Sequence, residues 1–135
     1  MTQRAAEAGK KDDGGKPRWD LLPPDAMDEL VRLYTAGADK YGEYNWAKGM
    51  SWSRVFAAMM RHAWSFWRGE NLDTDPVGAK QHHMASVAWC ALTLLAYTLR
   101  KAGTDDRPVL TKRDPTPAEE ALLNKQTLAL LRSGG

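Results

Sequence analysis

The strongest constraint on the fold is the stretch at residues 84–97, which is apolar almost all the way round a helix. It is too short to span a bilayer and is interrupted by Ser86 and Thr93. A helix with apolar residues on every side is buried at the centre of a domain or in a subunit interface. Strand-like alternation of apolar and polar residues is absent from the sequence. We therefore predict an all-α fold in which this segment is the central helix or lies in a subunit interface.

Three further segments predict the helices around it. Residues 24–40 and 51–68 place apolar side chains at helical spacing, and a capping-box pattern at residues 116–119 opens a helix that continues to about residue 132. The central helix is expected to begin after the turn at residues 76–78 and to end near residue 101. Pro24 suits a first-turn position, Gly42 suits a helix end, and Ser51 or Ser53 can cap the second helix.

The 135 residues fit one folded domain. We expect a flexible tail over residues 1–15, the helical domain over 16–103, a linker over 104–116, and a helix with a short tail over 117–135. The segment at residues 16–22 is expected to be an extended lead-in that could dock Trp19 and its leucines.

Composition narrows the function classes. The net charge of +2 is too mild to indicate nucleic-acid binding by itself. The single cysteine, Cys90, excludes an internal disulfide and is expected to be a buried small hydrophobe. The polar N-terminus has no apolar signal-peptide core, so we expect a soluble, cytoplasmic protein without membrane association.

The acidic segment at residues 69–75 is the first candidate site. Glu70 and Asp73 are three residues apart and project from one side of a helical turn, and Asp75 follows. Two such charges about 5–6 Å apart repel by roughly 3 kcal/mol at an effective dielectric near 20. Mg²⁺ or Mn²⁺ would remove that repulsion. A solvated acidic turn is the simpler interpretation, and spacing alone favours it.

Other polar residues could complete such a site. His62, His82 and His83 flank the acidic segment and suit hydrogen bonds to a carboxylate or phosphate better than Mg²⁺ ligation. Asp28 and Glu29 could add carboxylates. The alternative is that these acidic residues, near the N-terminus of a helix, only offset the helix dipole.

Basic and aromatic residues provide candidates for binding phosphates and a base. Lys40 lies eleven residues beyond Glu29, on the same side of the predicted helix. A basic stripe recurs every seven residues at Arg54, Arg61 and Arg68. Trp46 could stack a base. Spacing alone favours a solvent-facing charged surface for the arginines, and packing in the core or in an interface for most of the aromatic residues.

Several strings of sequence are more specific together than singly. They are Gly15-Lys16-Pro17-Arg18-Trp19-Asp20-Leu21-Leu22-Pro23, Gly37-Ala38-Asp39-Lys40-Tyr41-Gly42, Asn45-Trp46 with Lys48-Gly49, Arg61-His62, Gly69-Glu70 with Asp73, and Met84-Ala85-Ser86-Val87-Ala88-Trp89. Over about residues 15–100 the chain resembles phage dATP/dGTP diphosphohydrolases of the MazZ type, which belong to the MazG-like all-α nucleotide pyrophosphohydrolases.

This resemblance implies a MazG-like bundle of three to four main helices that forms a homodimer or homotetramer. It implies Mg²⁺-dependent cleavage of purine deoxynucleoside triphosphates, dGTP or dATP, between the α- and β-phosphates, with Mn²⁺ able to substitute. The products would be a nucleoside monophosphate and pyrophosphate. In phages that replace adenine with 2-aminoadenine, such enzymes adjust the nucleotide pool. Stable nucleic-acid binding is not expected.

The resemblance also implies roles for individual residues. Glu70 and Asp73 match the family's E-x-x-D motif, whereas the family's E-E-x-x-E motif is only partly present at Asp28-Glu29. Glu29, Glu70 and Asp73 are thus expected to be catalytic metal ligands, assisted by Asp75. The expected substrate-binding residues are Lys40, Asn45, Trp46, Arg61, His62 and His83, with the choice between His82 and His83 open.

Two alternatives remain at this point. A non-catalytic helical module could bind nucleic acid through the basic stripe or could bind another protein. The same fold could also act on dUTP or dCTP.

Overall fold

The computed structural model describes residues 8–74, 80–109 and 114–134. These residues form α1 (Pro24–Tyr41), α2 (Trp52–Trp67), α3 (His83–Arg100) and α4 (Pro117–Ser133), with 3-10 turns η1 (Trp19–Leu21) and η2 (Asn45–Lys48). Within these described ranges there are two isolated β-bridges and no strand. The prediction of an all-α fold is confirmed.

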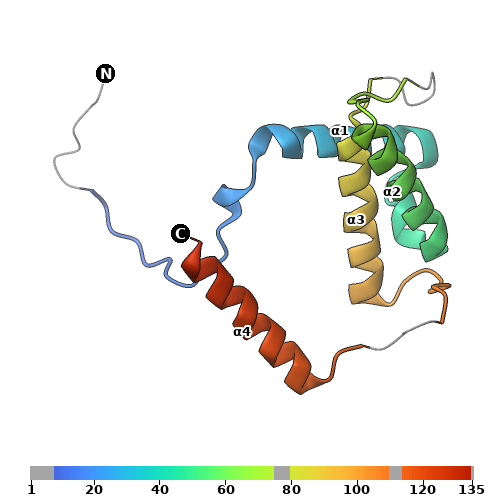
Figure 1. Cartoon of the computed structure of the whole chain (residues 1–135). Helices are drawn as coiled ribbons and strands as arrows, with labels where there is room; N and C mark the ends of the chain where they lie inside the picture. The colour runs from blue at the N-terminus through green and yellow to red at the C-terminus, as the bar shows by residue number, and fades with distance from the viewer. Residues whose placement is uncertain (1–7, 75–79, 110–113, 135) are drawn as a thin grey trace.

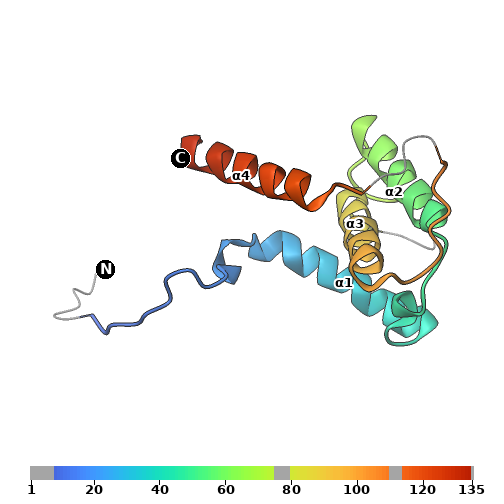
Figure 2. The same ribbon diagram turned by 90° about the horizontal axis from the view of Figure 1, so that it is seen from below.

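Helices α1, α2 and α3 form the folded core. Helix α2 lies beside α3, and α1 crosses one end of this pair (Figures 1 and 2). The buried residues Val55 of α2 and Cys90 and Tyr97 of α3 form the centre of the packing. Six of the eight buried residues found in the described part of the chain belong to α3. The predicted central position of this helix is therefore confirmed.

Local sequence signals set most of the helix ends. Pro24 occupies the first turn of α1, and Gly42, at φ 93°, donates its N–H to the Ala38 carbonyl at 2.8 Å to end that helix. The predicted capping box of α4 is formed between Thr116 and Glu119. Each of these ends follows from residues within a few positions of it.

The start of α2 differs from the prediction. Ser51 is its N-cap residue but makes no side-chain capping hydrogen bond. The carboxylate of Asp106, far along the chain, instead accepts a hydrogen bond from the Ser53 N–H at 2.9 Å and another from the Ser53 hydroxyl. A tertiary contact therefore takes the place of a local cap.

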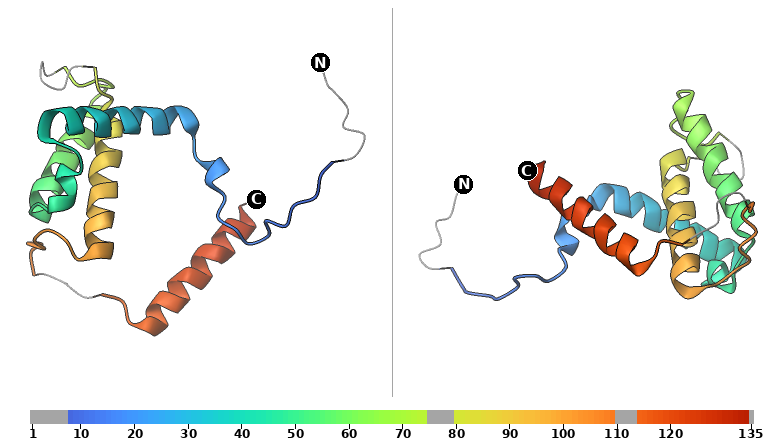
Figure 3. Two further views of the ribbon diagram at one scale, coloured as in Figure 1. Left: turned by 180° about the vertical axis from the view of Figure 1, so that it is seen from behind. Right: turned by 60° about the horizontal axis from the view of Figure 1, so that its bottom comes forward.

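Large apolar side chains remain outside the core. Trp19 is 76% exposed, so the expected docking of the 16–22 segment was wrong. Helix α4 does not pack on the three-helix core, and its side chains are exposed apart from half-buried Glu119 (Figure 3). None of the helices in the described ranges is long and apolar enough to cross a membrane.

Candidate functional site

Backbone pairing fixes the acidic segment against the start of α3. The Asp73 N–H donates to the Gln81 carbonyl at 2.8 Å, and the His83 N–H donates to the Asn71 carbonyl at 2.9 Å. Leu72 and His82 form an antiparallel bridge between these two hydrogen bonds. The segment that follows α2 is thereby held beside the first turn of α3.

The centre of the site is the imidazole of His83, the first residue of α3, which is only 4% exposed. Its Nε2 lies 2.8 Å from Oε1 of Glu70, and its Nδ1 lies 2.8 Å from Nδ1 of His62. The two imidazole rings are 5.1 Å apart. Both ring nitrogens of a buried histidine are therefore engaged by polar partners from the end of α2 and the residues after it.

Asp73 completes a compact group with the two histidines. One ligand atom from each of His62, Asp73 and His83 lies within 4.8 Å of the other two. The three side chains come from α2, from the segment after it and from α3. In the part of the chain that the structure describes, no other set of three His, Cys, Asp or Glu side chains converges in this way.

Electrostatic shifts favour a neutral His62 and an ionised Glu70. Burial lowers the pKa of His62, and the nearby His83 and Arg61 lower it further, while Asp73 opposes the shift. The hydrogen bond from His83 holds the pKa of the Glu70 carboxyl below its usual value. Near neutral pH the site thus offers an imidazole lone pair beside carboxylate oxygens.

The other predicted carboxylates are placed differently. Glu29 lies 3.1 Å from Nη1 of Arg32 and lines a cavity of about 520 Å³ between α1 and α3, whose lining also includes His82. It does not join the group formed by His62, Asp73 and His83. Asp28 is exposed on α1, and Asp75 lies outside the described residues.

The predicted nucleoside-binding residues are near one another. Asn45 and Trp46 line a small cavity of about 60 Å³ together with Tyr34. The Trp46 ring packs edge-on against Tyr34 at 6.2 Å, and its carbonyl accepts a hydrogen bond from the Tyr97 hydroxyl at 2.6 Å. Trp46 therefore contributes to packing, and its stacking on a base stays a prediction.

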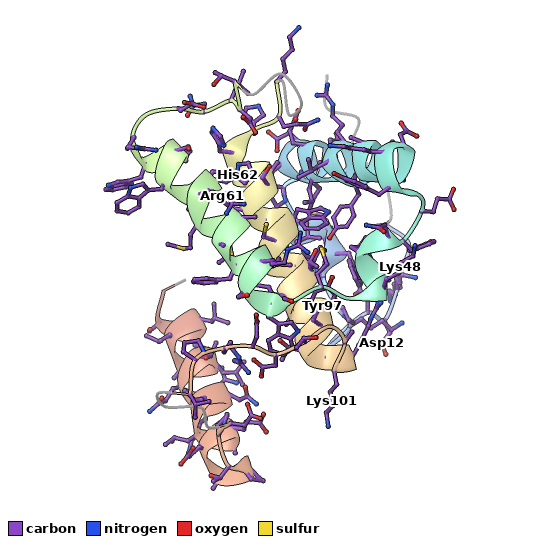
Figure 4. All side chains as sticks on the ribbon, turned by 90° about the vertical axis from the view of Figure 1, so that its right-hand side faces the viewer. Asp12, Lys48, Arg61, His62, Tyr97 and Lys101 are labelled. Carbon is purple, nitrogen blue, oxygen red and sulfur yellow. The ribbon has the colours of Figure 1, made fainter. Side chains whose placement is uncertain are left out.

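The predicted phosphate-binding residues lie on different helices. Arg61 lines a cavity of about 360 Å³ with Arg54 and Trp89. Figure 4 shows Arg61 next to His62 on α2, where that helix runs beside α3. Lys40 is exposed at the end of α1, with Nζ 5.0 Å from the centroid of the Tyr41 ring.

The ligand atoms of the site suit the expected Mg²⁺ less well than other divalent cations. Mg²⁺ prefers an all-oxygen octahedral shell, whereas Mn²⁺, Co²⁺ and Zn²⁺ also accept imidazole nitrogen. Two imidazoles and one carboxylate, with Glu70 adjacent, fit a divalent cation of the second kind better. Sequence reasoning assigned the histidines to hydrogen bonding, because only the packing of α2 on α3 reveals that their rings converge.

The family model for the N-terminal region of dATP/dGTP diphosphohydrolases matches residues 6–107. The chain belongs to this family. The match contains α1, η2, α2, the acidic segment and α3, and it ends before α4. The resemblance to dATP/dGTP diphosphohydrolases that was inferred from the sequence is confirmed.

A curated relative gives the same description. The dATP/dGTP diphosphohydrolase of Salmonella phage PMBT28 is 30% identical over 99 residues, which make up 73% of this chain and 33% of the relative. The chain thus spans about a third of the length of the relative that it matches. No solved structure gives a significant match.

Proposed function

We propose that this member of the dATP/dGTP diphosphohydrolase family is a metal-dependent hydrolase of purine deoxynucleoside triphosphates. It would cleave dGTP or dATP between the α- and β-phosphates and release a monophosphate and pyrophosphate. We propose the phage nucleotide pool used for 2-aminoadenine genome synthesis as its setting. The observation that carries the proposal is the convergence of Glu70, His83, His62 and Asp73 inside the family match.

The acidic segment supplies the chemistry in this proposal. Asp73, with Glu70 beside it, would hold the divalent cation, which supplies charge neutralisation and an acidified water when bound, whereas Glu29 lines a separate cavity between α1 and α3. The hydrogen bond between Glu70 and His83 fixes the orientation of both side chains. The antiparallel backbone pairing holds Asp73 next to them. Positioning and charge neutralisation account for most of the catalysis of phosphoryl transfer, so the chain needs no nucleophile of its own.

Residues around the acidic segment would bind the rest of the nucleotide. Arg61 lies beside His62 and could place its guanidinium on the phosphate chain, because a planar guanidinium pairs two oxygens at once. Lys40 would contact the outer phosphates. Asn45 and Trp46, which line one cavity, would contact the sugar and base.

We also propose that the protein works as a homodimer or homotetramer. Both helices of the α2–α3 pair expose a stripe of large apolar side chains, made up of Phe56, Met60, Trp64 and Trp67 on α2 and of Leu92, Leu95 and Leu99 on α3. Soluble monomers rarely expose extended apolar surfaces of this kind. In the proposed oligomer, a second copy of the chain would cover these apolar side chains.

Product analysis tests the reaction. The protein is incubated with each of dGTP, dATP, dUTP and dCTP in water enriched in ¹⁸O, with Mg²⁺ or Mn²⁺. The products are separated and their masses are measured by mass spectrometry. Pyrophosphate with ¹⁸O in the monophosphate supports attack at the α-phosphorus. Release of inorganic phosphate contradicts the proposed bond, and faster turnover of dUTP or dCTP contradicts the proposed base preference.

A further inference from the structure

We propose that His62, Asp73 and His83 form a binding site for one transition-metal ion of the Mn²⁺, Co²⁺ or Zn²⁺ class, with Glu70 as the residue that positions His83. The site is inferred from the geometry of the metal-free side chains. Its use in catalysis rests on the proposed function, because Asp73 would serve both.

The proton positions around His83 point its free lone pair into the site. A carboxylate only accepts hydrogen bonds, so the contact of Glu70 with His83 places a proton on Nε2 of His83. In the neutral ring, Nδ1 of His83 then carries a lone pair, and this atom lies 2.8 Å from Nδ1 of His62. A contact between two Nδ1 atoms needs a proton on one of them, and with both rings neutral and Nε2 of His83 protonated, that proton would be on His62. With metal, the proton of His62 would reside on Nε2, and two nitrogen lone pairs would face the same ion.

The distances suit a single small cation. Ligand atoms bound at about 2.0–2.1 Å to a tetrahedral ion lie roughly 3.3 Å apart. The nitrogens of His62 and His83 are already 2.8 Å apart, and one Asp73 oxygen lies within 4.8 Å of both. To bind one ion, the His62–His83 contact would have to open slightly and the Asp73 carboxylate would have to approach the two nitrogens.

The hydrogen bonds around the proposed ligands resemble those found around metal ligands in other proteins. Metal-binding histidines usually donate their second N–H to a carboxylate, which fixes the tautomer and raises the basicity of the ligand. Glu70 has this position relative to His83. Backbone hydrogen bonds at Asp73 and His83 hold the acidic segment against α3. The ligands are therefore preorganised by three parts of the fold.

The charges of the site match a divalent ion. Imidazoles bind a metal ion in their neutral form, so the carboxylates of Asp73 and Glu70 would supply the two negative charges of the site. A bound dication would balance them. The mixed nitrogen and oxygen donors favour Mn²⁺, Co²⁺ or Zn²⁺ over Mg²⁺, which dehydrates reluctantly and prefers oxygen.

Metal binding to the full chain tests the site without nucleotide. Protein treated with EDTA and desalted is titrated with CoCl₂, and the visible absorption bands of the ion are recorded. One Co²⁺ per chain should bind, Zn²⁺ should displace it, and Mg²⁺ at the same concentration should not. Asp73→Asn and His62→Ala should each weaken binding at least tenfold. His82→Ala, which changes an exposed neighbour outside the group, is the matched control.

The outcomes separate this inference from the proposed function. Unchanged Co²⁺ binding in His62→Ala overturns the site, as does binding by Mg²⁺ with equal affinity. Circular dichroism of each variant shows whether the helices remain, and the wild-type displacement series is informative even where a variant fails to fold. Stoichiometric Co²⁺ binding that needs His62, in a protein that hydrolyses no nucleotide, supports the site and contradicts the hydrolase proposal.

Discussion

Glu70 and His83 are joined by a 2.8 Å contact between the Oε1 and Nε2 atoms, although one side chain is 44% exposed and the other only 4%. The contact links the acidic segment to the buried first residue of α3. His83 also reaches His62 through its other nitrogen. A change at the exposed carboxylate therefore reaches the buried end of α3 through one imidazole ring.

Replacing Glu70 tests this linkage. Glu70→Gln retains an oxygen that can accept the His83 hydrogen bond but removes the charge, whereas Glu70→Ala removes both. We expect Glu70→Gln to lower kcat/KM for dGTP by at least the 10- to 100-fold typical of carboxylates that support metal-bound histidines. Glu70→Ala should lower kcat/KM further and also lower the melting temperature. Glu43→Gln, on the loop after α1, is the control.

An equal loss of melting temperature in Glu70→Gln and Glu70→Ala would contradict the part assigned to the hydrogen bond. Full activity in Glu70→Ala would remove this residue from the catalytic site. Steady-state kinetics and thermal unfolding, measured on the same preparations, check both statements.

The pH dependence of stability tests the environment of His62. Its folded-state pKa is lowered from the ordinary 6.5, so between the two values the unfolded chain binds more protons than the folded one. The free energy of unfolding of the metal-free protein should therefore fall as pH drops below about 6.5. Glu70 contributes separately, because its pKa is lowered from 4.5 and its stabilisation is lost only below that pH.

Urea unfolding in EDTA-containing buffers from pH 8 to pH 5 measures the effect. His62→Gln should flatten the curve over this interval, because glutamine does not titrate. An unchanged slope in His62→Gln would assign the pH dependence to other groups. His82→Gln controls for the removal of an exposed histidine.

Much of the fold follows from local sequence signals, and the site does so only in part. Pro24, Gly42 and the Thr116–Glu119 pair set helix ends that could be predicted, because each acts within a few residues. The Asp106 cap on α2 could not be predicted, since it joins positions 53 residues apart.

The candidate site could be predicted only in its acidic part. The three-residue spacing made Glu70 and Asp73 candidates, and the family resemblance then favoured them over a solvated acidic turn. The contact between His62 and His83 depends on how α2 packs against α3, and no spacing rule gives that arrangement. The partial acidic motif at Glu29 predicted a metal ligand on α1. In the structure, however, Glu29 lines a separate cavity between α1 and α3.

Tyr97 ties the predicted nucleoside-binding turn to the core. Its hydroxyl donates to the Trp46 carbonyl at 2.6 Å, and its side chain is 1% exposed. Tyr97→Phe leaves that carbonyl without its hydrogen bond, so we expect a loss of about 1–3 kcal/mol in the free energy of unfolding. Urea denaturation measures this loss. Tyr44→Phe, at an exposed tyrosine, should cost little, and equal losses in both variants would contradict the tether.

A substitution in the exposed apolar stripe of α2 tests the proposed oligomer. Met60 and Trp64 are 43% and 59% exposed, although large apolar side chains of this kind usually find a partner. Trp64→Glu would place a charge in the proposed interface, where burying it without a partner is unfavourable. We expect the variant to sediment as a monomer in analytical ultracentrifugation while the wild type sediments as a dimer or tetramer. Trp19→Glu, which changes a 76% exposed tryptophan outside α2 and α3, should leave the assembly intact. A monomeric wild-type protein, or a Trp64→Glu variant with unchanged mass, would contradict this interface.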